Sequence, residues 1–376
     1  GKTTTSYMVR HLLESSKKSC SLFGTITNYV NGHPLISSAT TPDAMELQRM
    51  LSMSRDENVV MEVSSHGLHQ KRVEGMEFNY AVFTNLSNDH LDYHKDINSY
   101  FETKYQLFKK LKPGGEAIVN SSCPWGKRLI RKLKAEGVAV YTFGEDVEDD
   151  LQLISINAIT KQIKVRAGGE AWQFRLAMPG IYNVENSLAA TLIALRMGLR
   201  KHQIKKAFKT FKGVPGRFEI YQHPSGVSLI VDYAHTPEGL ESFLKALHHS
   251  KPNKIFHVFG FRGDGDASKR QAMMETSVRF SDEVILTFDD LNGVSSSEMV
   301  KTLTQLGMQW GGNKAIIIPD RTKAVEYAWN KAKSGDLIAI TGKGPEPYKD
   351  RFALPSGNDS ETIQFLFDLQ ANVNQL

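Results

Sequence analysis

Apolar runs of strand length alternate with longer segments of helical spacing along most of this chain. In the first half, such runs predict strands at residues 21–26, 59–63, 81–84, 117–119 and 138–143. Helical patterns lie between them, for example at 42–53 and 98–111. Because strands that alternate with helices pair side by side, the pattern predicts α/β architecture with a mostly parallel sheet.

Residues 151–176 break this alternation. The segments 151–157, 162–165 and 171–174 predict short antiparallel strands, and Gly168-Gly169 has the composition of a hairpin turn. A helical pattern at 183–197 follows.

A segment rich in Gly and Pro, at 212–217, separates this region from a second α/β rhythm. Strands are then predicted at 228–231, 255–260, 283–287, 315–318 and 337–341, and each of the first four precedes a helix-length segment. The chain has 376 residues, whereas one domain usually takes roughly 100–200. We therefore expect two domains, residues 1–214 and 215–376.

The composition, 40% hydrophobic and 23% charged, is that of a globular protein. No apolar run approaches the roughly 18–20 residues that cross a bilayer, and no apolar leader segment follows Gly1. Two cysteines cannot make a disulfide framework, so we expect a cytoplasmic protein without a membrane anchor. The net charge of +5 is spread along the chain, which disfavours nucleic-acid binding and suits small anionic substrates.

The first residues, Gly1-Lys2-Thr3-Thr4, match the closing half of a phosphate-binding P-loop. In such a loop the backbone N–H groups hold phosphate oxygens, the lysine neutralises charge, and the first hydroxyl binds Mg²⁺. The fragment G-K-T is short, and a chance match remains an alternative. A P-loop glycine normally follows a strand and four loop residues, so we expect the chain to be a fragment or shortened at its front.

Two polar side chains follow neighbouring predicted strands. Glu62 lies at the end of the run 59–63, and His90 follows the run 81–84. Open α/β sheets bind ligands at the carboxyl ends of their strands, where a carboxylate and an imidazole would complete an oxygen-rich Mg²⁺ shell. Taken singly, each residue is more typical of a polar loop, whereas the two at matching strand ends favour the metal site.

Lys104 shares the helical spacing of Phe101, Tyr105 and Phe108. A buried ammonium is costly unless it is paired or neutral. Its stem can lie along the apolar stripe while the amine reaches solvent. Alternatively, burial keeps the amine neutral and able to react with CO₂, and the resulting carbamate would be an anion suited to Mg²⁺.

Together these motifs resemble those of Mur ligases, in the same order and over nearly the whole chain. The longest are N-L-S-N-D-H-L-D-Y-H at 85–94 and V-D-Y-A-H-T-P at 231–237. The other matching stretches are 1–5, 40–42, 62–67 with Arg72, 100–108, 178–186, 213–219 and 342–346. The pattern is most similar to the branch of the family that makes the muramyl tripeptide.

The resemblance implies a P-loop ATPase-like central domain and a C-terminal Rossmann-like domain, without the family's N-terminal UDP-binding domain. Matching positions imply catalytic roles for Lys2, His90 and Lys104, and magnesium ligands at Thr3, Glu62, His90 and a carbamylated Lys104. The implied ATP-binding residues are Gly1, Lys2, Thr3, Thr4, Asn183, Asn186, Arg217, Asp232 and His235. Those implied for the muramyl peptide are Thr40, Thr41, Ser64, Ser65 and Arg72, and those around the amino acid are Asp290, Asn292, Lys343 and Glu346.

The implied reaction uses ATP as co-substrate and Mg²⁺ as cofactor. The free carboxylate of UDP-N-acetylmuramoyl-L-alanyl-D-glutamate attacks the γ-phosphate, and an amino acid then displaces phosphate from the acyl phosphate to form an amide. Mg²⁺ and Lys2 would neutralise the charge that develops. The family also implies a cytoplasmic monomer that acts in peptidoglycan precursor synthesis.

The chain departs from the family around the amino-acid pocket. The branch that adds meso-diaminopimelate has a D-N-P-R motif, and its arginine position falls here on Asn292. A neutral amide cannot replace the charge-assisted contact of an arginine, so the sequence favours lysine or another amino acid over diaminopimelate. Asp289 and Asp290 would then be available to a side-chain ammonium. The family's K-G-H-E motif reads Lys343-Gly344-Pro345-Glu346 and lacks its histidine.

Two alternatives remain open at this level. One is a Mur-type amide ligase outside peptidoglycan synthesis, such as a cyanophycin-like, poly-γ-glutamate-like or secondary-metabolite enzyme. The other is a degenerate homologue that binds without turnover. Retention of Glu62, His90 and Lys104 together argues against the second.

Overall fold

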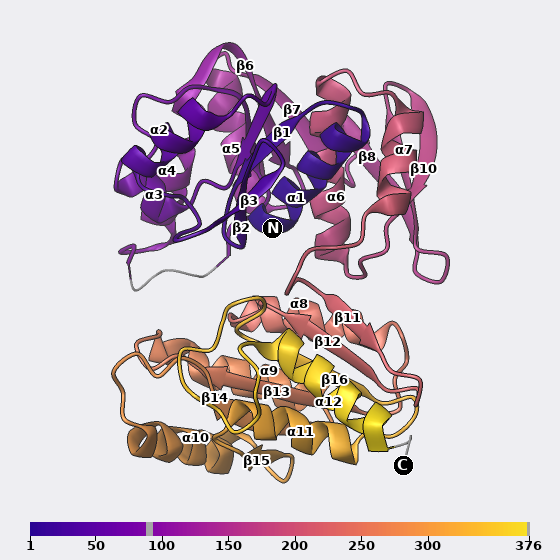
Figure 1. Ribbon diagram of the computed structural model, residues 1–376. Helices are drawn as coiled ribbons and strands as arrows, with labels where there is room; N and C mark the ends of the chain where they lie inside the picture. The colour runs from indigo at the N-terminus through magenta and orange to yellow at the C-terminus, as the bar shows by residue number, and fades with distance from the viewer. Residues whose placement is uncertain (88–92, 374–376) are drawn as a thin grey trace. The chain divides into compact units, whose positions relative to one another are not determined.

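The computed structural model describes residues 1–87 and 93–373, with side chains up to residue 370, and divides into two compact units, Gly1–Lys212 and Gly213–Leu376. Figure 1 shows helices and sheets in both units, so the predicted α/β class is correct. In the described residues, no helix is long and apolar enough to span a membrane.

One sheet of the N-terminal unit has the strand order β3-β2-β1-β4. Its strands are β1 (Cys20–Phe23), β2 (Thr27–Val30), β3 (His33–Ile36) and β4 (Asn58–Met61). β1 and β4 are parallel, whereas β2 pairs antiparallel with both β1 and β3. The β2–β3 hairpin is absent from the sequence prediction. Its turn, Asn31-Gly32, has φ of 52° and 78°, and Asn-Gly is the common signal for such a turn.

A second sheet has the order β10-β9-β8-β7-β6-β5. Its strands are β5 (Phe78–Phe83), β6 (Leu111–Asn120), β7 (Ala139–Gly144), β8 (Leu151–Asn157), β9 (Gln162–Ala167) and β10 (Glu170–Arg175). β5 to β8 pair in parallel, and β8 to β10 are antiparallel, as the pattern at 151–176 predicts. Gly168 and Gly169 make the β9–β10 turn with positive φ.

The helices of this unit are α1 (Lys2–Ser15), α2 (Ala44–Met53), α3 (Ser65–His69), α4 (Ile97–Tyr105), η1 (Phe108–Lys110), α5 (Pro124–Ala135), α6 (Ile181–Arg196) and α7 (Lys201–Thr210). Several of these helices have a side-chain cap at their N-terminus. At α4, the Asp96 carboxylate accepts a hydrogen bond from the backbone N–H of Ser99. The prediction of one helix over 98–111 is wrong at its end, because α4 stops at Tyr105. Phe108 reaches the core from a 3₁₀ turn, so the apolar spacing continues where the α-helix does not.

The C-terminal unit contains one sheet of order β11-β12-β16-β13-β14-β15. Its strands are β11 (Glu219–Gln222), β12 (Ser228–Asp232), β13 (Ile255–Phe261), β14 (Glu283–Phe288), β15 (Ala315–Ile317) and β16 (Leu337–Thr341). The helices are α8 (Pro237–His248), η2 (Ala267–Lys269), α9 (Arg270–Phe280), α10 (Ser296–Trp310), α11 (Arg321–Lys331) and α12 (Asp359–Val373). β16 lies between β12 and β13, so the strand order reverses there, where open α/β sheets commonly bind ligands.

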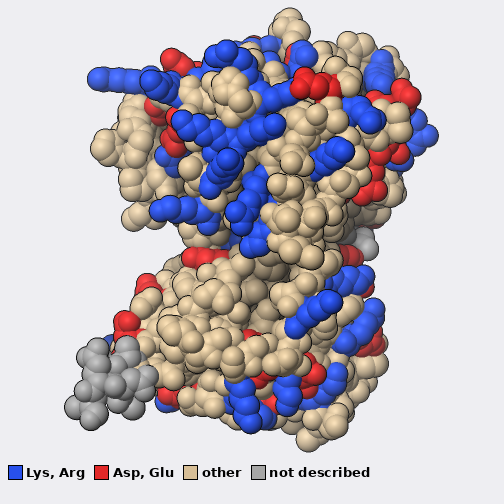
Figure 2. All heavy atoms as spheres, turned by 90° about the vertical axis from the view of Figure 1, so that its right-hand side faces the viewer, with Lys and Arg blue, Asp and Glu red and all other residues tan. Residues whose placement is uncertain are grey.

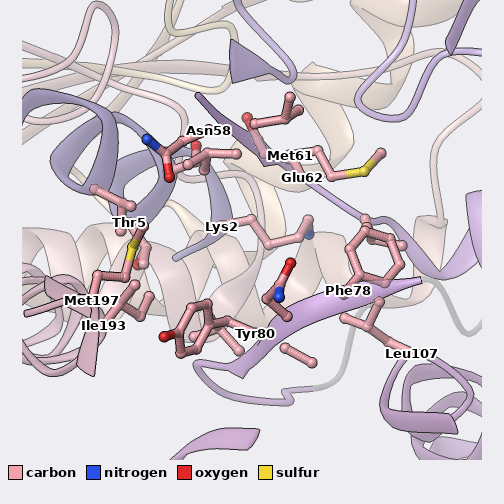
Figure 3. A pocket seen from close by; sticks show the side chains of 18 of the residues that line it. Lys2, Thr5, Asn58, Met61, Glu62, Phe78, Tyr80, Leu107, Ile193 and Met197 are labelled. Carbon is pink, nitrogen blue, oxygen red and sulfur yellow. The ribbon is translucent and has the colours of Figure 1, made fainter. Parts of the chain in front are cut away.

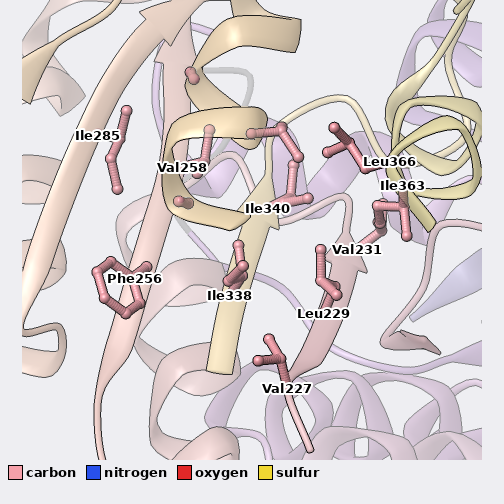
Figure 4. Packing of buried hydrophobic residues seen from close by; sticks show 13 residues of the cluster. Val227, Leu229, Val231, Phe256, Val258, Ile285, Ile338, Ile340, Ile363 and Leu366 are labelled. Carbon is pink, nitrogen blue, oxygen red and sulfur yellow. The ribbon is translucent and has the colours of Figure 1, made fainter. Parts of the chain in front are cut away.

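The core of the C-terminal unit is built on β16. Ile338 and Ile340 are fully buried and pack with Val258 of β13 and with Ile363 and Leu366 of α12 (Figure 4). A strand covered on both faces needs such a continuous apolar run, which explains why its sequence is almost entirely hydrophobic.

A fully buried ion pair anchors the end of this strand. The Arg321 guanidinium makes two hydrogen bonds, of 2.7 and 2.8 Å, with the Asp359 carboxylate. It also donates to the carbonyl oxygen of Thr341, the last residue of β16. The pair therefore fixes the start of the loop that carries Lys343.

Candidate active site

The N-terminus of α1 faces a buried carboxylate. Thr3, in the first turn, donates a 2.8 Å hydrogen bond from Oγ1 to Oε2 of Glu62, which lies just beyond β4 and is 2% exposed. Gly24 makes this approach possible, because a Cβ there would lie 2.3 Å from Oε1 of Glu62. The structure therefore places a hydroxyl, a carboxylate and a helix N-terminus together, which is a suitable arrangement for a phosphate with its cation.

Thr25 is a member of this site that the sequence reasoning missed. Its backbone N–H and its hydroxyl donate to the two oxygens of Glu62, at 2.9 and 3.0 Å. Its hydroxyl also lies 3.1 Å from Oγ1 of Thr40. Thr25 lies two residues beyond the end of β1, so the same argument that singled out Glu62, a polar residue at the carboxyl end of a strand, could have found it.

These groups fit a magnesium ion. Among the described residues, the donors that reach Glu62 belong to Thr3 and Thr25 and are neutral, so its buried charge has no cationic partner in those contacts. A buried charge is costly without a counter-ion, and Mg²⁺ prefers carboxylate and hydroxyl oxygens. His90, the predicted histidine ligand, lies outside the described residues. Within them, no three His, Cys, Asp or Glu side chains cluster.

Asn186 of α6 lies beside the start of α1. Its Oδ1 is 3.3 Å from the hydroxyl of Thr5, and a Cβ on Gly1 would lie 2.6 Å from the same oxygen. Asn183, one turn earlier, is 1% exposed and donates to the carbonyl oxygen of Pro179 at the start of the helix. The structure thus places Asn186 beside the N-terminus of α1, where phosphate binding is predicted. Asn183 instead stabilises the N-terminus of α6.

Lys2 and Thr4 take different positions in α1. Thr4 is 5% exposed within the core, whereas Lys2 lines a cavity of about 760 Å³ between β4 and β5. Figure 3 shows the Lys2 side chain lying across this cavity between Met61 and Phe78. In this conformation its stem occupies an apolar space.

Lys104 is half-buried in the last turn of α4. Its ammonium lies 4.8 Å from the centre of the Tyr100 ring, and that ring stacks on the imidazole of His94 with 4.8 Å between ring centres. A cation over an aromatic face is attracted to it. These contacts agree with both predicted states of this amine, so carbamylation stays a prediction.

The residues predicted for the muramyl peptide surround the loop after β4. Thr41 is fully buried and donates from its hydroxyl to the carbonyl oxygen of Glu62, while the backbone N–H of Ser64 donates to that hydroxyl. Ser64 caps α3, in whose first turn Ser65 is buried. Arg72 donates to the carbonyl oxygen of Thr41 at 2.6 Å. This cluster holds the Glu62 loop in place, and a role in binding a substrate stays a prediction.

In the C-terminal unit, Asp232 ends β12 and organises the turns beside it. Its carboxylate accepts from the backbone N–H groups of Phe218 and Ala234, both at 2.8 Å. Burial raises the pKa of Asp232, and Arg217 and these two N–H groups oppose that shift. The Arg217 guanidinium stacks 4.1 Å from the centre of the Tyr233 ring. Nδ1 of His235 lies 2.7 Å from the Tyr233 carbonyl oxygen, so all three predicted nucleotide residues adjoin this strand end.

A network of charged side chains lies at the ends of β13, β14 and β16 in the same unit. Lys343, 1% exposed, lies 2.5 Å from Oδ1 of Asp290, and Lys349 lies 3.2 Å from the other oxygen. Burial alone would raise the pKa of Asp290, but the two lysines hold it below its ordinary value. Asp290 is therefore already paired with two lysines of this chain, and binding of an incoming ammonium by its carboxylate stays a prediction.

Asn292 and Glu346 extend this network through further hydrogen bonds. The Asn292 amide donates to Asp264 at 2.6 Å and accepts from Lys349 at 3.0 Å. Glu346 accepts from the Tyr233 hydroxyl and from Arg262, a residue that the sequence reasoning did not assign. Arg262 follows β13 directly, so its position at a strand end was the available signal.

Figure 2 shows Lys and Arg side chains gathered over the face of the N-terminal unit that is turned to the viewer. Such a surface raises the local concentration of anions. It is consistent with the small anionic substrates expected from the net charge.

Comparisons with known proteins identify both units. Residues 1–194 match the Mur ligase middle domain, and residues 216–344 match the Mur ligase glutamate ligase domain. UDP-N-acetylmuramoyl-L-alanyl-D-glutamate--2,6-diaminopimelate ligase of Alkaliphilus oremlandii (strain OhILAs) is 35% identical over 351 residues, which cover 92% of this chain and 72% of that protein. The protein of the same name from Thermosynechococcus vestitus is 36% identical and is covered over 71% of its length.

Solved structures give the same picture. A structure of a UDP-N-acetylmuramoyl-L-alanyl-D-glutamate--2,6-diaminopimelate ligase matches with a TM-score of 0.67 at 28% identity, over 98% of this chain and 77% of that one. Folylpolyglutamate synthase of Mycobacterium tuberculosis matches with a TM-score of 0.74 over 98% of this chain and 89% of that one. At 17% identity, the second likeness shows the fold alone.

Proposed function

Because this chain belongs to the Mur ligase family, it is an ATP-dependent amide ligase, and we propose that its substrate is UDP-N-acetylmuramoyl-L-alanyl-D-glutamate in peptidoglycan precursor synthesis. The observation that carries the proposal is the Thr3–Glu62 pair at the N-terminus of α1. It joins a phosphate-binding helix end to a buried carboxylate without a cationic partner among its described contacts, as a nucleotide with its metal requires.

In this proposal, the residues at the start of α1 and Glu62 have separate roles in the reaction. The N-terminus of α1 binds the β- and γ-phosphates, and Lys2 neutralises charge on them as the substrate carboxylate attacks. Thr3 and Glu62 would hold Mg²⁺, which supplies further charge neutralisation when bound. Attack forms a bond from a carboxylate oxygen to γ-phosphorus and releases ADP. The amino group of the acceptor then attacks the acyl carbon, which releases inorganic phosphate and a proton.

We propose meso-diaminopimelate as the acceptor, against the preference that Asn292 suggested. The similar proteins named above are diaminopimelate ligases. The positive charge that Asn292 lacks is supplied close by, because the Lys349 ammonium lies 3.0 Å from the Asn292 amide oxygen. Asp290 is also less suited to a second ammonium, since the buried Lys343 ammonium, 2.5 Å from its Oδ1, already neutralises it.

An ADP-release assay with UDP-N-acetylmuramoyl-L-alanyl-D-glutamate, ATP, Mg²⁺ and single amino acids tests the proposal. Release that requires both the muramyl dipeptide and meso-diaminopimelate is the expected result. Release with L-lysine in its place would leave the ligase standing and overturn the acceptor. If the protein binds ATP but releases no ADP with any amino acid, the muramyl substrate is wrong and an acid outside the peptidoglycan pathway must be sought.

A further inference from the structure

The positive charge of the chain is concentrated in one stretch of the N-terminal unit. Residues 151–212, from β8 to α7, contain 11 Lys and Arg but 2 Asp and Glu, which gives a net charge of +9. The whole chain carries +5, so the remainder is net negative. This differs from the spread expected along the chain. Such a charge asymmetry is typical of proteins that bind a nucleic acid or a membrane surface.

Helix α7 carries much of this charge in one row. Lys201, Lys205 and Lys209 are four residues apart, so they lie on one side of the helix, and Lys206 adjoins them. Lys201 forms a 2.6 Å ion pair with Glu170 of β10. Among the described residues, no Asp or Glu pairs with the other three lysines. Their charge is therefore available to an anion outside the chain.

The end of α7 lies beside the end of β10 and the turn between β8 and β9. Phe208 of α7 stacks on Phe174 of β10, with 4.7 Å between ring centres. Just beyond β10, the backbone N–H of Leu176 donates to the carbonyl oxygen of Lys161 in that turn. Figure 1 shows α7 and β10 on the right-hand side of the N-terminal unit, and Figure 2 shows Lys and Arg gathered on this side. Four of these cations form what is here named the basic surface: Lys161, Lys205, Lys206 and Lys209.

The turn between β8 and β9 also exposes an apolar side chain to solvent. Ile159 is 94% exposed, and Ile156, near the end of β8, is 43% exposed. An isoleucine gains free energy when it leaves water for an apolar medium. Exposed apolar side chains next to lysines are typical of surfaces that bind the boundary between lipid headgroups and acyl chains.

The chemistry of this surface fits a lipid bilayer better than a nucleic acid. Proteins that bind single-stranded nucleic acids stack the bases on exposed aromatic side chains. The aromatic side chains of β10 and α7 are buried, since Trp172, Phe174 and Phe208 are 6%, 3% and 1% exposed. A phosphate backbone also offers no apolar partner to Ile159, whereas acyl chains do.

We propose that the basic surface binds the anionic headgroups of a lipid bilayer, and that Ile159 inserts at the boundary between the headgroups and the acyl chains. The distribution of acidic residues favours one orientation. The acidic segment 145–150 immediately precedes β8, about 20 Å from the β8–β9 turn along that strand. An anionic bilayer repels these carboxylates, so the turn and the basic surface face the lipid.

Vesicle co-sedimentation tests the proposal on the chain without substrates. Vesicles of equal parts phosphatidylglycerol and phosphatidylcholine should bind the protein, and vesicles of phosphatidylcholine alone should not. The triple variant Lys205→Gln, Lys206→Gln, Lys209→Gln should bind the anionic vesicles about 100-fold more weakly, because each lysine near such a surface contributes roughly fivefold. Failure of the unaltered protein to bind the anionic vesicles would overturn the proposal.

A second triple variant, Lys254→Gln, Lys301→Gln, Lys333→Gln, is the matched control. It removes the same charge from three exposed lysines of the C-terminal unit and should bind as the unaltered protein does. An equal loss in the two triple variants would show that net charge alone attracts the protein, and the basic surface would then not be the site. Thermal unfolding shows whether each variant remains folded.

Ile159→Ser separates a bilayer from other anionic partners. The variant should bind anionic vesicles about tenfold more weakly, because serine gains nothing from the acyl region, and should bind heparin as the unaltered protein does. Unchanged vesicle binding would overturn the insertion of Ile159. If a single-stranded oligonucleotide displaces the protein from the vesicles and binds Ile159→Ser equally well, the partner is a nucleic acid and the proposal fails. None of these measurements depends on the ligase reaction.

Discussion

The Thr3 hydroxyl donates a 2.8 Å hydrogen bond to the Glu62 carboxylate, across 59 positions of the sequence. One residue belongs to the first turn of a helix and the other follows a strand. Because the two side chains are in contact, they form a buried site that can bind a cation and a phosphate together.

Glu62→Gln is expected to lower ADP release about 100-fold or more, because the amide keeps the shape and loses the charge that holds Mg²⁺. The apparent Mg²⁺ requirement should rise with it. Folding should be little affected, since removal of an unpaired buried charge does not weaken the core. Steady-state kinetics across a Mg²⁺ titration, with thermal unfolding beside it, measures both effects.

Asp56→Asn is the matched control for Glu62→Gln. Asp56 accepts hydrogen bonds from Ser21 and from the backbone of Asn31, and it has no assigned role in the reaction. An unchanged Mg²⁺ requirement in Glu62→Gln, or an equal change in Asp56→Asn, would remove Glu62 from the metal site.

Lys104→Ala should lose turnover by about 100-fold, if its amine carries a carbamate that serves Mg²⁺. A short carboxylate such as formate should then restore part of the activity by taking the place of the carbamate. Lys109→Ala is the control, because its ammonium also lies over a ring, 5.1 Å from the centre of Tyr105, and is exposed. Full activity of Lys104→Ala without formate contradicts the carbamate.

Lys349→Gln is expected to reduce kcat/KM for meso-diaminopimelate about tenfold relative to that for L-lysine, since one charge-assisted contact is lost. Asn292→Arg should shift the same ratio in the opposite direction. Lys323→Gln, which removes an exposed lysine of α11 paired with Glu326, should leave the ratio unchanged. A ratio in Lys349→Gln equal to that of the unaltered protein would show that Lys349 does not select the acceptor.

Stability should depend on pH through His257. This fully buried imidazole lies between the hydroxyls of Ser277 and Thr341, and burial, with a smaller effect of Arg321, lowers its pKa from 6.5 to about 3. Below pH 6.5 the unfolded chain binds a proton that the folded chain does not. The stability that neutral His257 contributes is therefore complete above pH 6.5 and is lost as the pH falls towards 3.

His257→Gln removes this proton linkage. Between pH 7.5 and 5.5, the unaltered protein should lose about 1 kcal/mol more unfolding free energy than the variant, as one proton taken up by the unfolded state requires. The other histidines are shared by both proteins and cancel in the comparison. Urea unfolding at the two pH values measures the difference, and parallel losses would mean that His257 binds its proton in the folded state.

Local sequence pattern accounts for most of the architecture. Apolar runs marked β1, β4 to β10 and β12 to β16, because the period of apolar residues reflects burial within each segment. The motifs around Gly1, Glu62 and Lys343 indicated the family for a similar reason, since each lies on a few consecutive residues. Asn31-Gly32 carried an equally local signal, and the β2–β3 hairpin could have been predicted from it.

Tertiary structure decided which of the marked residues meet. The sequence placed Glu62 at a strand end, but only the fold brought the Thr3 hydroxyl to its Oε2 and the backbone N–H of Thr25 to its Oε1. The sequence likewise indicated an acidic side chain at Asp290. Only the fold pairs it with Lys343, 53 positions away, and this ion pair determines what the carboxylate can still bind. Periodicity is a property of neighbouring residues, while the charge and burial of a site depend on segments far apart in the chain, and those distances are set when the sheets and helices pack.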